Sequence, residues 1–143
     1  MKPIAVLTTI PSDSHNWNLL FISLFLEEQG FSVINLGPSV PYDVVLDTCN
    51  QYHPDLLVVS TINGHGYIEG RELIMRVRDM DIMKDKPVFI GGKLSTDENM
   101  SSLYVLELEE GGYTKAYTGN VNMQDFTTRL QSIAAQSAIS RQA

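Results

Sequence analysis

The chain has 143 residues, 43% hydrophobic and 19% charged, a composition typical of one globular domain and not of a disordered, collagenous or coiled-coil protein. Ten Lys and Arg against seventeen Asp and Glu give a formal net charge of −7, which offers no positive field to nucleic acid or an anionic membrane. The single Cys49 excludes an internal disulfide and a multi-thiolate metal site. With no signal-peptide pattern and no apolar run long enough to cross a bilayer, we expect a cytoplasmic protein without nucleic-acid or membrane partners.

Short apolar runs alternate with longer amphipathic segments from the start of the chain, which is the pattern of parallel βα units. The first run, residues 4–8, predicts a strand, and a polar loop separates it from a helical pattern over residues 19–29. Gly30 is a suitable residue to end that helix. Residues 31–36 then predict a second strand, and residues 41–52 a second helix that begins at a proline.

The second half of the chain continues the same alternation. Residues 56–60 form a continuous apolar run, typical of a central strand that is buried on both faces. The elements predicted after it are a helix at residues 68–80, a strand at 87–90, a short helix at 98–110, a strand at 113–117 and a closing helix at 123–135.

Five βα units without a linker or a repeat predict one α/β domain of the flavodoxin-like, three-layer doubly wound class over residues 1–135. Its parallel five-stranded sheet is expected in the order 2-1-3-4-5, and a polar, frayed tail is expected at residues 136–143. Ligands of such folds bind beyond the carboxyl ends of the strands, near the switch point between strands one and three. The loops at residues 9–18, 60–66 and 91–96 are therefore the candidate site.

The first of these loops carries Asp13 and His15, two residues apart. A carboxylate that accepts a hydrogen bond from one imidazole nitrogen fixes the tautomer and leaves the other nitrogen free to bind a metal. The alternative is that Asp13 or Ser14 caps the following helix and His15 is a polar residue of its first turn.

The other two loops contain Ser60 and the pair Gly91 and Gly92. A hydroxyl at the end of the central strand suits a hydrogen bond to a flat heteroaromatic group between the layers, although Ser60 would also serve as a helix cap. The two glycines form either a tight turn or a stretch of bare backbone against a planar cofactor. His65 is a weak candidate for a second metal ligand because no third His or Cys accompanies it.

Several nucleotide and enzyme motifs are absent from the sequence. It has no G-x-x-x-x-G-K-[ST] loop, no G-x-G-x-x-G after the first strand and no nucleophile elbow. Ser60 stands where a phospho-acceptor receiver domain would have an aspartate. The three loops therefore match none of these nucleotide-binding, hydrolase or receiver-domain motifs.

Taken together, Asp13-x-His15, Ser60-x-Ile62 and Gly91-Gly92 resemble the cobalamin (B12)-binding domain family, whose signature is D-x-H-x-x-G, S-x-L and G-G. The nearest likeness within it is to the small (sigma) subunit of glutamate mutase, also called methylaspartate mutase, in the stretches at residues 12–15, 31–37, 59–66 and 111–113. The chain departs from the signature at Asn18, where the motif has glycine, and mildly at Ile62, where it has leucine.

The resemblance implies that His15 replaces dimethylbenzimidazole as the lower ligand of cobalt, so that cobalamin binds base-off, and that Asp13 orients this histidine. It also implies that the displaced nucleotide tail enters a slot beside the central strand. There Ser60 would hydrogen-bond the benzimidazole, and Gly91 and Gly92 would line the tail.

The resemblance further implies an isomerase subunit that uses adenosylcobalamin in the conversion of glutamate to 3-methylaspartate. One small domain covers only the lower face of the corrin, so the reaction needs a larger partner subunit. The resemblance implies that this partner is a TIM barrel, that the two chains form a hetero-oligomer, and that this chain carries no catalytic residue. The alternatives are a non-catalytic corrinoid carrier or sensor, and a degenerate B12-fold interaction module, which Asn18 supports.

The residues that we predict to bind the cofactor lie in the three loops and around the end of the fifth strand. His15 alone is predicted to be the metal ligand. Trp17 is expected either to pack over the corrin or to form a hydrophobic staple on the first helix. The full set is Asp13, Ser14, His15, Asn16, Trp17, Asn18, Ser60, Thr61, Ile62, Gly64, Gly91, Gly92, Tyr117 and Gly119.

Overall fold

The computed structural model describes residues 2–118 and 123–142, and its five parallel strands form one sheet. The strands are β1 (Ile4–Thr8), β2 (Ser32–Asn35), β3 (Leu56–Thr61), β4 (Val88–Gly92) and β5 (Lys115–Thr118). The helices are α1 (Trp17–Glu28), α2 (Tyr42–Tyr52), α3 (Gly66–Arg78), α4 (Ser101–Gly111) and α5 (Met123–Gln142), with short 3₁₀ turns at Asp81–Met83 and Glu98–Met100.

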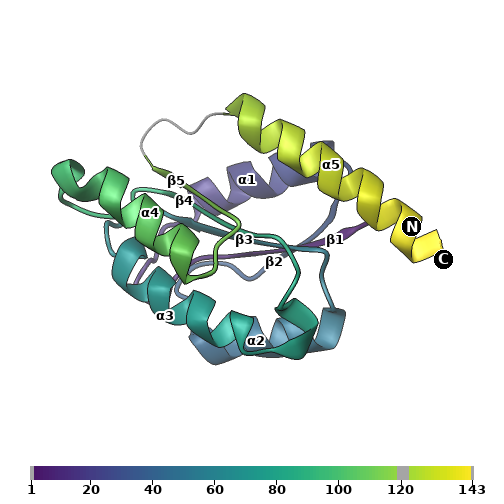
Figure 1. The fold of residues 1–143 in the computed structure, drawn as a ribbon, viewed down its shortest axis with the longest axis horizontal. Coiled ribbons are helices and arrows are strands. Elements are labelled where there is room, and N and C mark those ends of the chain that lie inside the picture. The colour runs from purple at the N-terminus through teal and green to yellow at the C-terminus, as the bar shows by residue number, and fades with distance from the viewer. Residues whose placement is uncertain (1, 119–122, 143) are drawn as a thin grey trace.

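The strand order is β2-β1-β3-β4-β5, so the predicted three-layer doubly wound fold is confirmed. Helices α1 and α5 cover one face of the sheet, and α2, α3 and α4 cover the other (Figure 1). Within residues 2–118 and 123–142, no helix has the length and hydropathy needed to span a bilayer.

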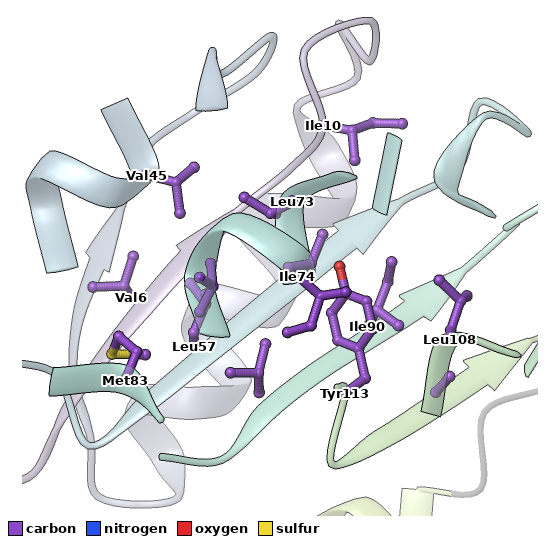
Figure 2. Close-up of a cluster of buried hydrophobic side chains, with 14 of the residues drawn as sticks. Val6, Ile10, Val45, Leu57, Leu73, Ile74, Met83, Ile90, Leu108 and Tyr113 are labelled. Carbon is purple, nitrogen blue, oxygen red and sulfur yellow. The ribbon is translucent and has the colours of Figure 1, made fainter. Parts of the chain in front are cut away.

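The apolar runs of β1 and β3 are buried on both faces of the sheet. Ala5 and Val58 point toward α1 and α5, whereas Val6 and Leu57 point toward α2 and α3. Figure 2 shows Val6 and Leu57 in the cluster that α3 covers. Because alternate side chains of a strand face opposite sides, a strand covered on both sides needs apolar residues throughout.

Helix α1 ends as predicted at Gly30, which has a φ of +98°. The N–H of Gly30 donates to the carbonyl of Glu27 (3.0 Å), and the N–H of Phe31 donates to the carbonyl of Leu26 (3.1 Å). This Schellman arrangement satisfies carbonyls at the helix end and leads the chain directly into β2.

Several element ends differ from the predicted bounds by one to three residues or more, and two of the differences have a clear physical reason. Strand β4 continues through Gly91 and Gly92, which pair with Ser60 and Thr61 of β3, because the backbone of glycine can join a ladder that a neighbouring strand provides. Helix α5 continues to Gln142, whereas we expected a frayed tail from residue 136. Residues 136–142 contain no Gly or Pro, and Ala, Gln and Arg among them favour helix.

Candidate functional site

Asp13, in the loop after β1, is fully buried and uses both carboxylate oxygens. Oδ1 accepts the backbone N–H of His15 (3.0 Å) and lies 2.7 Å from Nδ1 of the same residue. Oδ2 accepts the Thr61 hydroxyl (2.7 Å) and the Ile62 N–H (2.9 Å). One carboxylate therefore connects the histidine loop to the end of the central strand.

These hydrogen bonds decide the ionisation of Asp13. Burial alone raises its pKa, but the bonds from the Thr61 hydroxyl and from the N–H groups of His15 and Ile62 outweigh burial and lower the pKa to about 2. The carboxylate is therefore ionised at neutral pH and can only accept hydrogen bonds, so Nδ1 of His15 must be the donor. In a neutral imidazole with the proton on Nδ1, Nε2 on the far side of the ring is the nitrogen that can bind a metal.

The side chain of His15 is 53% exposed at this edge of the sheet, which leaves its outer nitrogen accessible to a ligand. The alternative role of the loop as a helix cap is wrong. Helix α1 starts at Trp17, its N-cap is Asn16, and no side chain caps it. Ser14 and Asn16, both predicted to bind the cofactor, are exposed residues of the same loop.

A second set of hydrogen bonds, which the sequence analysis missed, fixes the same loop through Ser12. The Ser12 hydroxyl bonds the carboxylate of Glu69 on α3, and the Ser12 N–H donates to the same carboxylate (3.1 Å). The Asn63 amide donates to the Ser12 hydroxyl (2.9 Å). Glu69 lies 57 residues from Ser12 along the chain, so no local pattern indicated this contact.

Among the described residues, no hydrogen bond joins His65 to Asp13 or His15. His65 is exposed, it precedes α3, and its N–H donates to the Asn63 side chain (3.0 Å). In the described part of the chain, no group of three or more His, Cys, Asp or Glu is placed to hold a metal. The metal-binding prediction therefore depends on His15 alone.

A cavity of about 380 Å³ opens beside this loop, between α1, α5 and the ends of β3, β4 and β5. Six predicted residues line it, namely Trp17, Asn18, Ser60, Gly91, Gly92 and Tyr117. The sequence analysis did not assign its apolar walls, which are Phe21, Ile22, Val58, Val59, Phe89, Ile90, Met123 and Phe126. Periodicity shows which face of an element a side chain takes but not where two layers separate, so it does not predict these walls.

The two glycines of β4 have different roles. A Cβ on Gly92 would lie 2.0 Å from the carbonyl oxygen of Thr61, and its φ is +116°, so the backbone itself requires glycine there. A Cβ on Gly91 would meet only Tyr117, at 3.5 Å and beyond. Gly91 therefore leaves bare backbone on the cavity floor, as one of the two sequence interpretations expected.

Two polar side chains of this mostly apolar lining, Asn18 of α1 and Ser60 of β3, lie next to each other. The Asn18 Nδ2 donates to the Ser60 Oγ at 3.1 Å, and the Asn18 Oδ1 is buried without a partner among residues 2–118 and 123–142. Ser60 lies within β3 and does not cap α3, which starts at Gly66. The hydroxyl of Tyr117 is already committed, because it donates to Asp125 at 2.6 Å.

Three further predicted residues, Thr61, Ile62 and Gly64, do not line the cavity. Thr61 and Ile62 hold Asp13, as described above. Gly64 forms a turn with a φ of +88°, where a Cβ would lie 2.7 Å from a methyl carbon of Thr96. Gly119 lies outside the described residues. A second groove, lined in part by Ile62, Gly92 and Lys93, shares Gly92 with the lining of the cavity.

Comparisons with known proteins agree with the predicted family. The family described as B12 binding domain matches residues 3–109. The glutamate mutase sigma subunit of Fusobacterium nucleatum is 26% identical over 116 residues, which cover 81% of this chain and 85% of that protein. The glutamate mutase sigma subunit of Escherichia coli O157:H7 is 27% identical over 125 residues, covering 87% of this chain and 83% of that protein.

Among solved structures, the chain is similar to a cobalamin-binding protein from Desulfitobacterium hafniense DCB-2, with a TM-score of 0.70 and 20% identity. The match covers 92% of this chain and 59% of that one, so this chain spans less than two thirds of the solved protein. Likeness at this identity shows the shared fold.

Proposed function

This chain belongs to the B12-binding domain family, which matches most of its length, and on that premise we propose that it is the cobalamin-binding subunit of a carbon-skeleton mutase of the glutamate mutase type. The relation to glutamate mutase sigma subunits over more than 80% of the chain supports an isomerase-associated role. The proposed cofactor is adenosylcobalamin, which supplies, when bound, a weak cobalt–carbon bond for radical chemistry.

The proposed lower ligand of cobalt is Nε2 of His15. The observation that carries this assignment is the fully buried, ionised Asp13, whose Oδ1 lies 2.7 Å from Nδ1 of His15. An ionised carboxylate on one imidazole nitrogen raises the basicity of the other and fixes the ring, as a metal-binding histidine requires. Thr61 and Ile62 donate hydrogen bonds to the other oxygen of Asp13, so bonds within the chain are enough to position the Asp13 and His15 pair.

The cavity beside α1 is the proposed slot for the displaced nucleotide tail. Its residues fit such a group, because the walls are apolar, the backbone of Gly91 is bare, and the buried carboxamide oxygen of Asn18 has no partner among the described residues. The hydroxyl of Ser60 accepts from Asn18 and keeps its own proton to donate to a ring nitrogen.

A larger partner subunit is part of the proposal. Four large apolar side chains form an exposed stripe along α1, with Trp17 84% and Phe21 64% exposed, and Leu20 and Leu24 about half exposed. Trp17 also lines the cavity and does not act as a hydrophobic staple. A partner that covered this stripe would enclose the cofactor. We propose a TIM-barrel subunit that binds glutamate and forms a hetero-oligomer with this chain, with 3-methylaspartate as the product.

The experiment that tests the proposal is a titration of the purified chain with hydroxocobalamin and adenosylcobalamin at neutral pH, followed by ultraviolet–visible spectroscopy. We expect a base-off, histidine-ligated spectrum that His15→Ala abolishes without changing the circular dichroism. His65→Ala is the matched control, because His65 is also an exposed loop histidine, and it should bind as the parent does. Equal binding by His15→Ala would contradict the ligand assignment.

Asn18 is the observation that favours a second candidate, a degenerate interaction module that has lost the cofactor. Its side chain stands where the family signature has glycine, and it already bonds Ser60. If no cobalamin bound even with a candidate large subunit present, this second function would replace the first. A corrinoid carrier or sensor is distinguished by cobalamin binding without turnover in the presence of that subunit.

A further inference from the structure

We infer that Glu69 on α3 is a positioning residue for His15, which acts through Ser12 on the loop that carries Asp13 and His15. The part of the inference that concerns cobalt rests on the proposed function, and the part that concerns the loop does not. We expect removal of Glu69 to weaken ligand binding by His15 and to leave the stability of the fold nearly unchanged.

Glu69 binds both hydrogen-bond donors of Ser12, the residue directly before Asp13. Its Oε1 accepts the backbone N–H of Ser12 at 3.1 Å, and its Oε2 accepts the Ser12 hydroxyl. A carboxylate has no proton to donate and two equivalent oxygens, so neither bond depends on which oxygen is which. Ser12 is exposed, so packing contributes little to its position and these bonds decide it.

The first turn of α3 gives Glu69 a rigid support. The carbonyl of Glu69 accepts the Tyr42 hydroxyl at 3.2 Å. The carbonyl of the next residue, Gly70, accepts the Tyr113 hydroxyl at 2.7 Å. A Cβ on Gly70 would lie 2.7 Å from Cδ1 of Ile90, so the helix packs directly against β4 at this turn. A side chain that starts from such a fixed backbone can hold its partner in one place.

A further hydrogen bond joins Ser12 to the loop after β3. The side-chain N–H of Asn63 donates to Ser12 Oγ at 2.9 Å, and Asn63 Oδ1 accepts the backbone N–H of His65 at 3.0 Å. A backbone N–H can only donate, so it fixes which end of the Asn63 carboxamide is the oxygen. The Ser12 hydroxyl therefore accepts from Asn63 and donates to Glu69, and both directions are fixed.

Ser12 and Asp13 are thus anchored to different elements. Asp13 binds the end of β3, as described above, and Ser12 binds α3 through Glu69. A single anchor would let the loop pivot about Asp13, whereas anchors on two adjacent residues fix both its place and its direction. The side chain of His15, two residues further on, is 53% exposed, so little packing would replace a lost anchor.

Removal of the Glu69 carboxylate should therefore separate ligand binding from stability. Ser12 lies at the surface, so water replaces the acceptor that its N–H and hydroxyl lose, and the free energy of unfolding changes little. The loop, however, loses one of its two anchors. The cost appears in ligand binding, since an outer residue that orients a metal ligand is worth about 10- to 100-fold in affinity.

The test compares the parent chain with Glu69→Ala and Glu69→Gln by spectroscopic titration with hydroxocobalamin, alongside urea denaturation. We expect the affinity to fall by about tenfold in Glu69→Ala and by about threefold in Glu69→Gln, whose amide oxygen still accepts one bond from Ser12. Glu72→Ala is the matched control, because Glu72 lies one turn further along α3 and pairs with Arg76. It should bind within about twofold of the parent.

A second readout needs no cobalamin. The His15 N–H donates to Asp13 Oδ1 at 3.0 Å, so its hydrogen exchange reports the order of the loop. In the ligand-free chain we expect this N–H to exchange about tenfold faster in Glu69→Ala, while the amides of β3 exchange as in the parent.

Unchanged affinity in Glu69→Ala, or unchanged exchange of the His15 N–H, would overturn the inference and leave the proposed function intact. Faster exchange of β3 with a matching loss of stability would also overturn it, because Glu69 would then support the fold as a whole. If the parent chain bound no cobalamin, the proposed function would be wrong, and the exchange of the His15 N–H alone would decide the inference.

Discussion

The two halves of the candidate site differ in how far the chain itself supplies hydrogen-bond partners for their polar groups. In the histidine half, Asp13 uses both carboxylate oxygens and positions His15 between the β1 loop and the end of β3. In the cavity half, the walls are apolar and the carboxamide oxygen of Asn18 has no partner in the part of the chain that the structure describes. On the proposed function, the chain's own hydrogen bonds would position the metal ligand, and the bound group would complete the polar contacts of the cavity.

The largest expected effect comes from removing the carboxylate of the histidine half. Asp13→Ala removes the acceptor of the His15 and Ile62 N–H groups and leaves the Thr61 hydroxyl only the longer bond to Asn63 Oδ1 (3.3 Å), so we expect a loss of about 3 kcal/mol in the free energy of unfolding. Histidine-ligated cobalamin binding should weaken by about 100-fold, because Nδ1 of His15 loses its acceptor. Urea denaturation and the spectral titration measure the two effects.

The matched control is Asp43→Asn, which alters an exposed carboxylate on α2 and should change neither quantity. If Asp13→Ala bound cobalamin as tightly as the parent, the Asp13 carboxylate would not be what positions His15 for binding.

The next effect is the pH dependence of stability. The pKa of Asp13 is lowered from 3.8 to about 2 in the folded protein, so the folded state favours the ionised form. This contribution of about 2 kcal/mol is present above the unfolded pKa near 4 and is lost as the pH falls toward 2. Unfolding free energies between pH 2 and pH 6 measure it.

Asp13→Asn has no titrating group at this position and serves as the reference. The stability difference between the parent and Asp13→Asn should shrink by about 2 kcal/mol on going from pH 6 to pH 2. A difference that did not vary with pH would mean that Asp13 is not preferentially ionised in the folded state.

The smallest expected effect concerns the cavity half. Gly91→Val places a branched side chain on the cavity floor next to Tyr117, so we expect cobalamin affinity to fall by about tenfold while thermal stability changes little. Gly111→Ala is the control, because a Cβ at that helix end meets nothing closer than 3.9 Å. Unchanged affinity in Gly91→Val would show that the tail does not use this cavity.

Much of the fold was predictable because its signals are local. The continuous apolar run at residues 56–60 predicted a strand buried on both faces, and β3 is buried along its whole length. Gly30 predicted the end of α1. Prediction was less accurate where pairing overrode local propensity, as at Gly91 and Gly92, which extend β4 because β3 lies beside them.

In the candidate site, too, short-range contacts were predictable and long-range contacts were not. Asp13 and His15 are two residues apart, so their contact was predictable from the backbone that joins them. The contacts of Asp13 with Thr61 and Ile62 span 48 and 49 residues, and that of Asn18 with Ser60 spans 42. No periodic pattern encodes such contacts.

The sequence by itself determined the order and kind of the elements, the Asp13 and His15 pair, and the three loops in which to look. The tertiary structure decided that a buried carboxylate joins two of those loops, that a cavity opens beside α1, and that Asn18 faces Ser60 within it. The physical reason is that short-range contacts follow from chain geometry, whereas long-range contacts depend on the register of parallel strands and on how the helical layers pack against them.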